Sequence, residues 1–527
     1  MCGIALIVSG LRIGLPTDSS IPTSGAEIIN FTNRSDLYSR AVVSVDDLKA
    51  ALLRRGPDSL GAKTLTLESR ISTPIDYLEN CCAELRFFGA TLQLRGLDAV
   101  VQPFEDSSGN ILIYNGEIFG GVHVDRDGND GEVLLHMLGK CCSCSSSEHE
   151  TACSSNEQGR DSIPHVLSSI KGPWALIYWQ YKSRTLWFGR DAFGRRSLLV
   201  HWPTESDNRF LLSSVSPGSS LEQNSDMEVD NGADVNFWEE LSCGIYSLSF
   251  DTRKIHGWLT GQVKRHGWTN STLMELIKWD RLSVEPQPVV FHSSHSQNVL
   301  LALRKSVMLR TSFHTNFQAV KSESRQNDIG PVAILFSGGL DSMILAALLN
   351  ECLDLNYGID LLNVSFDGEC APDRISAKAG LQELRRLAPL RRWKLVEIDA
   401  DLSNLTTEMK HVMTLIKPAK TYMDLNIGTA LWLAASGEGW VYEGTNNINN
   451  ENQQRFRYKS EARIVLVGSG ADEQCAGYGR HKTKYRCGSW RGLHEEMKLD
   501  MQRIWKRNMG RDDRCISDNG KEISFLG

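Results

Sequence analysis

A cysteine at position 2, directly after the initiator methionine, has the clearest chemical potential in the chain. A small residue there permits removal of Met1, which would leave a thiol and a free α-amine on one residue. The ordinary pKa of that amine, about 7.7–8.0, leaves part of it unprotonated at neutral pH. Cys2 could then supply both the nucleophile and its base. A chance cysteine is the competing interpretation, and the rest of the chain must decide between the two.

Three short segments of the first half could complement this thiol. A guanidinium on a rigid Arg-Gly-Pro-Asp turn suits a substrate carboxylate, an Asn-Gly pair after a strand suits an oxyanion, and an acid in an Asn-Asp-Gly-Glu segment could bind an ammonium group. Each segment alone could be an ordinary turn, but together they predict a glutamine site. The predicted catalytic set is Cys2, Asn115 and Gly116. The predicted glutamine-binding residues are Arg55, Gly56, Pro57, Asp58, Asn115, Gly116, Glu117 and Asp130.

A glycine-rich junction between a strand and a helix, Phe336–Ser342, is the strongest motif of the second half. Its glycines let the backbone approach an anion at the start of the helix, and Asp341 could hold a Mg²⁺ ion on the phosphates. The motif is not a Walker loop, which needs GxxxxGK[ST]. A second acidic glycine loop, Gly468–Glu473, follows another buried strand. Because ligands lie outside the carboxyl ends of such strands, Asp341 and Asp472 are predicted to share one metal and pyrophosphate site.

Two patterns of elements must position these residues. The first half has short strands bounded by Gly, Asp or Pro, such as Ile111–Tyr114, Ala175–Trp179 and Leu198–His201. After a linker at Ser283–Gln297, strands alternate with helices, which predicts a mostly parallel α/β sheet. The expected domains are residues 2–285 and 297–527. The expected elements of the second domain are strands Pro331–Phe336, Leu361–Phe366, Lys394–Ile398 and Arg463–Val467, with helices Ser342–Leu353 and Arg374–Leu387.

Three polar stretches are expected to be disordered insertions, near residues 17–35, 141–160 and 213–234. The second contains four cysteines and a histidine. Their spacing is not a paired zinc framework, so we expect no zinc. The residues concerned are Cys141, Cys142, Cys144, His149 and Cys153.

Composition places the chain among ordinary globular proteins, with 41% apolar and 23% charged residues. The net charge of −7 argues against a general nucleic-acid binder. We see no signal peptide and no apolar run long enough for a membrane helix. The thirteen cysteines are therefore expected to be reduced thiols in a cytoplasmic protein.

The motifs of the first half, with Arg190–Arg195 downstream, resemble the class II glutamine amidotransferase domain. Joined to the Ser-Gly-Gly-Leu-Asp-Ser and Gly-Ser-Gly-Ala-Asp-Glu loops, they resemble the glutamine-dependent asparagine synthetase family. Segments at Ala371–Ile375, Arg480–His481 and Gly510–Arg514 are closer still to a branch of asparagine synthetase domain-containing proteins. The resemblance covers nearly the whole chain outside the polar insertions.

The resemblance implies an α+β, four-layer αββα Ntn-hydrolase-like sandwich, followed by a Rossmann-like α/β ATP-pyrophosphatase domain. It also implies that Cys2 releases ammonia from glutamine, that Mg-ATP adenylates aspartate, and that ammonia displaces AMP to give asparagine. ATP and Mg²⁺ are the implied co-substrate and cofactor. Glutamine and aspartate are the other implied small-molecule partners, and a homodimer is allowed. The implied ATP-binding residues are Phe336, Ser337, Gly338, Gly339, Asp341, Ser342, Val364 and Gly468, with Asp341 and Asp472 on the metal.

Two departures from that pattern predict a poor synthetase step. Ser469 stands where the family has a glutamate linked to adenylate formation. The chain ends at Ile523–Gly527, where the family continues into helices carrying a catalytic lysine, so we expect a C-terminally truncated second domain. Two alternatives stay open: a binding or scaffold protein that kept the fold without the chemistry, and amidation of a different carboxylate, such as a β-amino-acid cyclisation.

Overall fold

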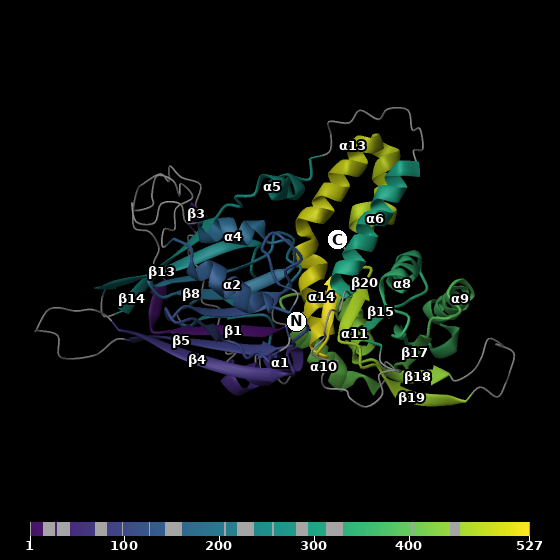
Figure 1. Cartoon of the computed structure of the whole chain (residues 1–527), viewed down its shortest axis with the longest axis horizontal. Helices are drawn as coiled ribbons and strands as arrows, with labels where there is room; N and C mark the ends of the chain where they lie inside the picture. Colours follow the sequence, from purple (N-terminus) through teal and green to yellow (C-terminus); the bar gives the residue numbers. More distant parts are fainter. Residues whose placement is uncertain are drawn as a thin grey trace, which may run out of the picture. The chain divides into compact units, whose positions relative to one another are not determined.

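The chain divides into two compact units, Met1–Lys278 and Trp279–Gly527, which are described separately (Figure 1). The computed structural model describes residues 2–13, 27–28, 43–68, 82–96, 98–125, 127–142, 161–204, 207–218, 237–255, 258–280, 293–311, 330–401, 404–442 and 454–525. The first predicted insertion, residues 17–35, lies outside them except for Glu27–Ile28.

The first unit contains two β-sheets whose strands pair mainly antiparallel. The order in one sheet is β12 (Glu239–Glu240), β10 (Leu199–His201), β11 (Phe210–Ser213), β1 (Gly3–Ser9), β5 (Cys82–Thr91), β4 (Ser59–Glu68). The order in the other is β2 (Leu11–Ile13), β14 (Trp258–His266), β13 (Gly244–Ile255), β9 (Thr185–Arg190), β8 (Trp174–Gln180), β7 (Ile111–Gly116), β6 (Phe104–Glu105), with β3 (Glu27–Ile28) against β14.

Helices cover the outer faces of the two sheets. Helix α1 (Val45–Arg55) lies against β1 and β5, while α2 (Asp130–Gly139) lies against β7 and beside α4 (Ile163–Ser169). A further short helix, α5 (Ser271–Lys278), ends the unit. The predicted αββα sandwich is thereby confirmed.

The alternation of side chains along β7 explains why two cores form. Ile111 and Ile113 belong to the core between the sheets, whereas Leu112 and Tyr114 belong to the core beneath α2 and α4. Successive side chains of a strand point to opposite faces, so an apolar strand with a layer on each side is buried on both. The neighbouring residues Tyr114 and Asn115 consequently lie on opposite faces of β7.

The second unit is built on one seven-stranded sheet. Its order is β19 (Arg455–Lys459), β18 (Glu438–Tyr442), β17 (Trp393–Asp399), β16 (Ile359–Ser365), β15 (Val332–Leu335), β20 (Ile464–Val467), β21 (Glu522–Phe525). Within this order, β17, β16, β15, β20 and β21 pair in parallel. Strand β18 pairs antiparallel with β17 and with β19. The helical segments are α6 (Ser293–Thr311), α8 (Leu340–Cys352), η2 (Gly368–Cys370), α9 (Pro372–Leu387), α10 (Thr406–Leu415), α11 (Tyr422–Ser436), α12 (Ala471–Cys475), α13 (Gly479–Ile504), η4 (Trp505–Met509) and α14 (Gly510–Ser517).

Three sequence predictions are wrong in detail. The linker expected to end at Gln297 gives way to α6 at Ser293. The insertion expected from Ser213 starts too early, because Ser213 closes β11 and Ser213–Ser216 are buried. Cys141 and Cys142 are likewise buried against the fold. In each case the polar composition of the segment did not indicate residues that form a helix or strand or that are buried in the fold.

The thiol prediction fails for one residue. Cys142 is disulfide-bonded, whereas the nine other described cysteines, Cys2 and Cys141 among them, are free. Composition predicts a cellular compartment, but it cannot show which cysteines lie close enough to form a disulfide. Within the described ranges, no helix combines the length and apolarity needed to cross a bilayer, and no three His, Cys, Asp or Glu side chains are grouped as a metal site formed by protein ligands alone would require.

Candidate functional site

Cys2 lies immediately before β1, where its main chain joins the two sheets of the first unit. Its backbone nitrogen donates a hydrogen bond of 3.0 Å to Oδ1 of Asn115 on β7. This nitrogen is the atom that becomes the α-amine once Met1 is removed. The residue is only 9% exposed, and burial raises the pKa of the Cys2 thiol. The thiol therefore needs a nearby base to become a nucleophile at neutral pH.

Asn115 has one half of its side-chain amide occupied and the other half open. Its oxygen accepts from Cys2, whereas Nδ2 is buried with no hydrogen-bond partner among the described residues. Buried donors are nearly always paired in native proteins. Next to it, a side chain at Gly116 would collide with the Pro173 carbonyl oxygen, because a Cβ there would lie 2.5 Å from it. An open amide beside a glycine suits the oxyanion role predicted for these two residues.

A pocket opens beside Cys2 and brings four of the predicted residues together: Cys2, Gly116, Glu117 and Asp130. Its lining comes mainly from the end of β5, the end of β7 and the start of α2. Of the described residues, the lining includes neither Arg55 nor the Asn115 side chain. The full set is Cys2, Thr91, Leu92, Gln93, Leu94, Arg95, Val100, Gln102, Phe104, Tyr114, Gly116, Glu117, Asn129, Asp130 and Gly131.

Asp130 is the first residue of α2, and the local sequence fixes it there. Asn129 caps the helix, with its side-chain oxygen accepting from the Gly131 N–H at 2.9 Å. Oδ2 of Asp130 accepts from the Ile118 N–H at 2.7 Å. Burial, with the nearby Glu117 charge, raises the pKa of Asp130 to about 7. The carboxylate is thus held in a place where a cationic ligand would stabilise its charged form.

Arg95 is the main residue of this pocket that sequence reasoning missed. Its Nε atom lies 2.7 Å from a Glu117 carboxylate oxygen, and its charge opposes the rise in the pKa of Asp130. The signal was weak, since a single arginine in a Gln-Leu-Arg-Gly stretch reads as a turn. Gly96 does turn the chain there, at φ +86°. Only the fold shows that this turn faces Glu117.

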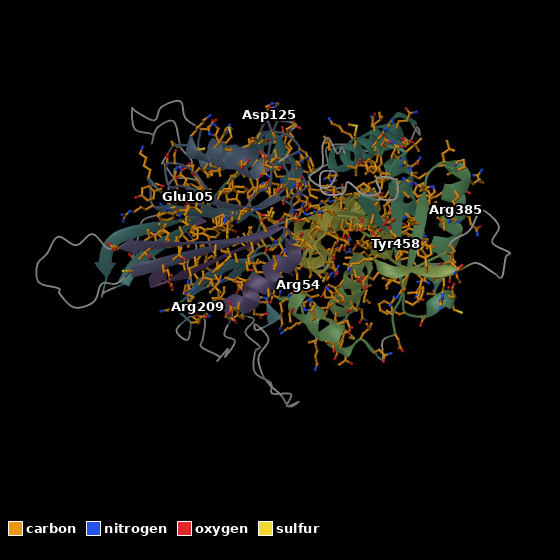
Figure 2. All side chains as sticks on the ribbon, turned by 60° about the horizontal axis from the view of Figure 1, so that its bottom comes forward. Arg54, Glu105, Asp125, Arg209, Arg385 and Tyr458 are labelled. Carbon is orange, nitrogen blue, oxygen red and sulfur yellow. The ribbon has the colours of Figure 1, made fainter. Side chains whose placement is uncertain are left out.

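The Arg-Gly-Pro-Asp turn lies behind the pocket wall. Asp58 accepts from the Gln93 N–H at 2.9 Å and donates its own N–H to Thr91 at 3.0 Å, so the turn holds the pocket-lining end of β5. Arg55 is fully buried, in contrast to its neighbour Arg54 at the outside of α1 (Figure 2). Gly56 is required for close packing, because a Cβ there would lie 2.4 Å from the Ala90 carbonyl carbon. A carboxylate clamp at Arg55 stays a prediction.

Gln102 was also missed, and it ties the pocket to β7. Its side-chain oxygen accepts from the Tyr114 N–H at 2.7 Å, and its side-chain nitrogen donates to the Tyr114 carbonyl at 3.1 Å. A hydrogen bond from this amide also lowers the pKa of the Cys2 thiol, against the larger effect of burial. A glutamine before a proline gave no sign of this role in the sequence.

In the second unit, the predicted nucleotide residues lie at the carboxyl ends of three adjacent parallel strands. Val364 lies near the end of β16, Phe336 follows β15, and Gly468 follows β20. Gly338 has φ +75°, and a Cβ there would lie 2.3 Å from the Ser376 backbone, so glycine is required. Gly339 caps α8 at its start. The loop thus presents the backbone and helix start that bind anions.

The two acidic glycine loops approach each other. A Cβ at Gly468 would lie 3.1 Å from Cβ of Asp341. Neither Asp341 nor Asp472 makes a side-chain hydrogen bond or ion pair with another described residue, and Asp341 is exposed. Free carboxylates are the oxygen ligands that Mg²⁺ prefers, and the phosphates of a bound nucleotide with water would complete its shell. The donor set therefore fits the metal that the sequence predicts.

Other polar groups of the second loop are already paired. Ser469 donates to Asp512 at 2.9 Å, and Arg511 binds the other oxygen of Asp512. Glu473 accepts from the Tyr478 hydroxyl at 2.7 Å and from Asn508 at 2.9 Å.

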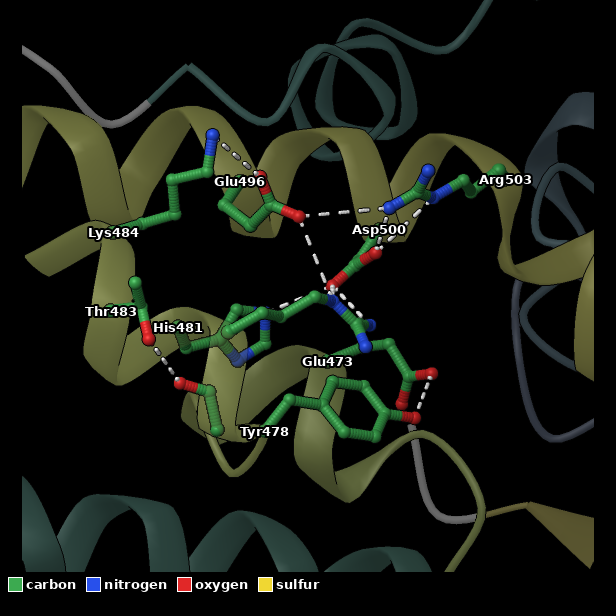
Figure 3. A network of polar contacts seen from close by, with 10 residues as sticks. Glu473, Tyr478, His481, Thr483, Lys484, Glu496, Asp500 and Arg503 are labelled. Carbon is green, nitrogen blue, oxygen red and sulfur yellow. Dashed lines mark hydrogen bonds and ion pairs between the residues drawn. The ribbon is translucent and has the colours of Figure 1, made fainter.

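Beyond Tyr478, the contacts continue along α13. Asp500 on its second half accepts from Arg480, His481 and Arg503 (Figure 3). Helix α13 can fold onto itself in this way because Ser489, at φ 54° and ψ −150°, breaks it into two halves. These contacts hold α13 in place after the Gly468–Glu473 loop and so support that loop.

Comparison with known proteins places these two sites in one family. A glutamine amidotransferase domain model matches residues 90–218, which include β7 and the pocket-lining residues other than Cys2. An asparagine synthetase domain-containing protein 1 of Bos taurus is 31% identical, over 91% of this chain and 83% of that protein. The protein of the same name in Gallus gallus is 33% identical, over 91% and 84%. A putative glutamine-hydrolysing asparagine synthetase 1 of Methanocaldococcus jannaschii is 27% identical, over 80% and 63%.

The first unit thus contains a glutamine amidotransferase domain within its αββα sandwich, and the second is an α/β domain. The chain belongs to the family of asparagine synthetase domain-containing proteins.

Proposed function

We propose that the protein hydrolyses glutamine in its first unit and uses ATP in its second to amidate a carboxylate, with aspartate as the acceptor. The observation that carries the proposal is the contact between the Cys2 backbone nitrogen and Asn115, next to an amide Nδ2 with no partner. One residue of β7 would thus hold both the base and the oxyanion.

The chemistry of the first unit follows from this geometry. After removal of Met1, the α-amine takes the proton of the Cys2 thiol, whose pKa burial raises. The thiolate attacks the side-chain amide carbon, while Asn115 Nδ2 and the Gly116 N–H stabilise the oxyanion. The α-amine returns the proton, ammonia leaves, and water hydrolyses the γ-glutamyl thioester to glutamate. Asp130 and Glu117 bind the α-ammonium group of glutamine.

In the second unit, Asp341 and Asp472 would hold Mg²⁺ on the phosphates of ATP. The metal neutralises phosphate charge when it is bound, and the loop at Gly338 and Gly339 orients the pyrophosphate. A serine at position 469 predicts that adenylation is slow, because its side chain carries no charge and its hydroxyl group is engaged by Asp512.

Ammonia release from glutamine tests the first unit. Mass measurement of the purified protein first shows whether Met1 is absent. The Cys2→Ala variant should release no ammonia above background, whereas Cys141→Ala, which removes another buried free thiol of the same unit, should release it at the parental rate. Activity retained in Cys2→Ala would refute the amidotransferase proposal.

Equilibrium titration with ATP and Mg²⁺ tests the second unit. Asp341→Ala should weaken Mg-ATP binding several-fold or more, because a charged ligand of the metal is lost. Asp354→Ala is a matched control, since it removes an exposed aspartate just beyond the opposite end of α8. Equal affinity in all three proteins, or no binding by the parent, would reduce the loop to a structural turn.

A further inference from the structure

The hydroxyl group of Tyr114 is buried in the wall of the glutamine pocket without a hydrogen-bond partner. The residue is 4% exposed, and the hydroxyl has no acceptor or donor within the described part of the chain. The residue lines the pocket together with Cys2, Glu117 and Asp130. An unpaired buried hydroxyl is unfavourable and calls for an explanation, such as a bound ligand or a water molecule.

The surroundings of this hydroxyl identify the kind of group that would satisfy it. After burial, the charges of Asp130 and Glu117 are the main causes that hold the pKa of Tyr114 well above its usual value, so the phenol stays neutral. The two carboxylates disfavour an anionic ligand at this hydroxyl group, although the Arg95 charge opposes their effect. A primary ammonium group is attracted by both and carries three donors, one for each of three oxygen acceptors.

The backbone opposite leaves the hydroxyl accessible to such a group. A Cβ at position 116 would lie 2.7 Å from the Tyr114 hydroxyl oxygen, so any side chain there would cover it. Gly116 thus serves two needs, close approach of its own backbone and an uncovered phenol.

We propose that the Tyr114 hydroxyl is a third acceptor for the α-ammonium group of glutamine, beside the carboxylates of Asp130 and Glu117. It selects ligands that carry this ammonium group. The inference rests on the proposed glutaminase function and adds a specificity-determining residue to that site.

An unpaired hydroxyl group alone does not support this assignment, as a second tyrosine of the same unit shows. Tyr178 on β8 is also buried with an unpaired hydroxyl, but it does not line the pocket. Tyr178→Phe therefore removes the same atom from the same unit without touching the ligand, which makes it the control for Tyr114→Phe.

The experiment measures ligand affinity in the Cys2→Ala background, where glutamine is not consumed. The probes are L-glutamine and 4-carbamoylbutanoate, the same molecule without its α-amino group. Tyr114→Phe should weaken L-glutamine binding about tenfold, as expected for a lost hydrogen bond to a charged group, and leave binding of 4-carbamoylbutanoate unchanged. Tyr178→Phe should change neither. The melting temperature of Tyr114→Phe should be equal to or above that of the parent, because an unpaired buried hydroxyl is removed.

Each other outcome has a defined meaning. Equal glutamine affinity in Tyr114→Phe and parent overturns the inference and leaves the hydroxyl to bound water, while the glutaminase proposal stands. Equal weakening of both probes, or a clear fall in melting temperature, overturns it in favour of a packing role. No binding of glutamine by the Cys2→Ala protein overturns the glutaminase proposal and this inference with it.

Discussion

The ends of β7 and β20 differ in how their polar groups are paired. At β7, Asn115 Nδ2 and the Tyr114 hydroxyl are buried without partners in the described structure. At β20, Ser469 and Glu473 are buried or half-buried with partners from the following helices. Because native proteins rarely leave buried polar groups unpaired, the first set is best assigned to a ligand and the second to holding a loop. In the second unit, the carboxylates of Asp341 and Asp472 are the groups that we propose for ligand binding.

The largest expected effect comes from the unpaired amide. Asn115→Ala should lower kcat for ammonia release by about 10²–10³, the usual loss for one oxyanion donor. Asn110→Ala is the matched change at the start of the same strand, where the amide is paired with Asp106 and with the Tyr181 N–H. Steady-state kinetics should show kcat retained in that folded control. Similar losses of kcat in both variants would remove the distinction between paired and unpaired amides.

A paired carboxylate should instead show its effect in stability. Asp512→Ala removes the acceptor of the Ser469 hydroxyl group. It also removes one carboxylate bound by Arg511, which keeps its contact with Asp424. Breaking such a buried pair should lower the free energy of unfolding by about 3 kcal/mol. Asp341→Ala removes an exposed, unpaired carboxylate and should stay within about 0.5 kcal/mol of the parent. Urea unfolding checks both values, and a larger loss for Asp341→Ala would reverse the assignment.

The smallest effect is a dependence of glutamine binding on pH. The pKa of Asp130 is raised to about 7, and an ammonium ligand needs its ionised form. Affinity of the Cys2→Ala protein for glutamine should therefore rise by roughly tenfold from pH 6 to pH 8. Without ligand, the pH dependence of folding stability has the opposite sign. Because the pKa of Asp130 is raised in the folded protein, the free energy of unfolding falls as pH rises from about 4 to about 7. Isothermal titration should show a flat profile for Asp130→Asn, and an equally steep profile there would assign the dependence to another group.

Local patterns in the sequence were enough to find most of the scaffold. The apolar runs at β7, β8 and β15 and the glycines at 338 and 339 follow from periodicity and backbone freedom, which neighbouring residues determine. The edge strand β19 and its neighbour β18 were missed because residues such as Arg455 and Glu438 are exposed and polar. An edge strand needs one covered side only, and its sequence therefore carries a weaker pattern.

Residues that act through long-range contacts could not be found in this way. Arg95 has its meaning only beside Glu117, and Asp512 only beside Ser469, which is 43 positions away. The unpaired state of Tyr114 and Asn115 is a property of the packed core and leaves no trace in spacing. What the sequence could predict was chemistry carried by neighbouring residues, such as Asn115 with Gly116.

Covalent labelling of the full-length protein with 6-diazo-5-oxo-L-norleucine, an electrophilic analogue of glutamine, tests the central claim most directly. Peptide mapping by mass spectrometry should find one adduct, on an N-terminal Cys2 that has lost Met1. Excess L-glutamine should prevent it, and the free thiol of Cys141 should stay unmodified. A protein that keeps Met1, an unlabelled Cys2, or labelling that glutamine does not slow would contradict the assignment of Cys2 as the nucleophile.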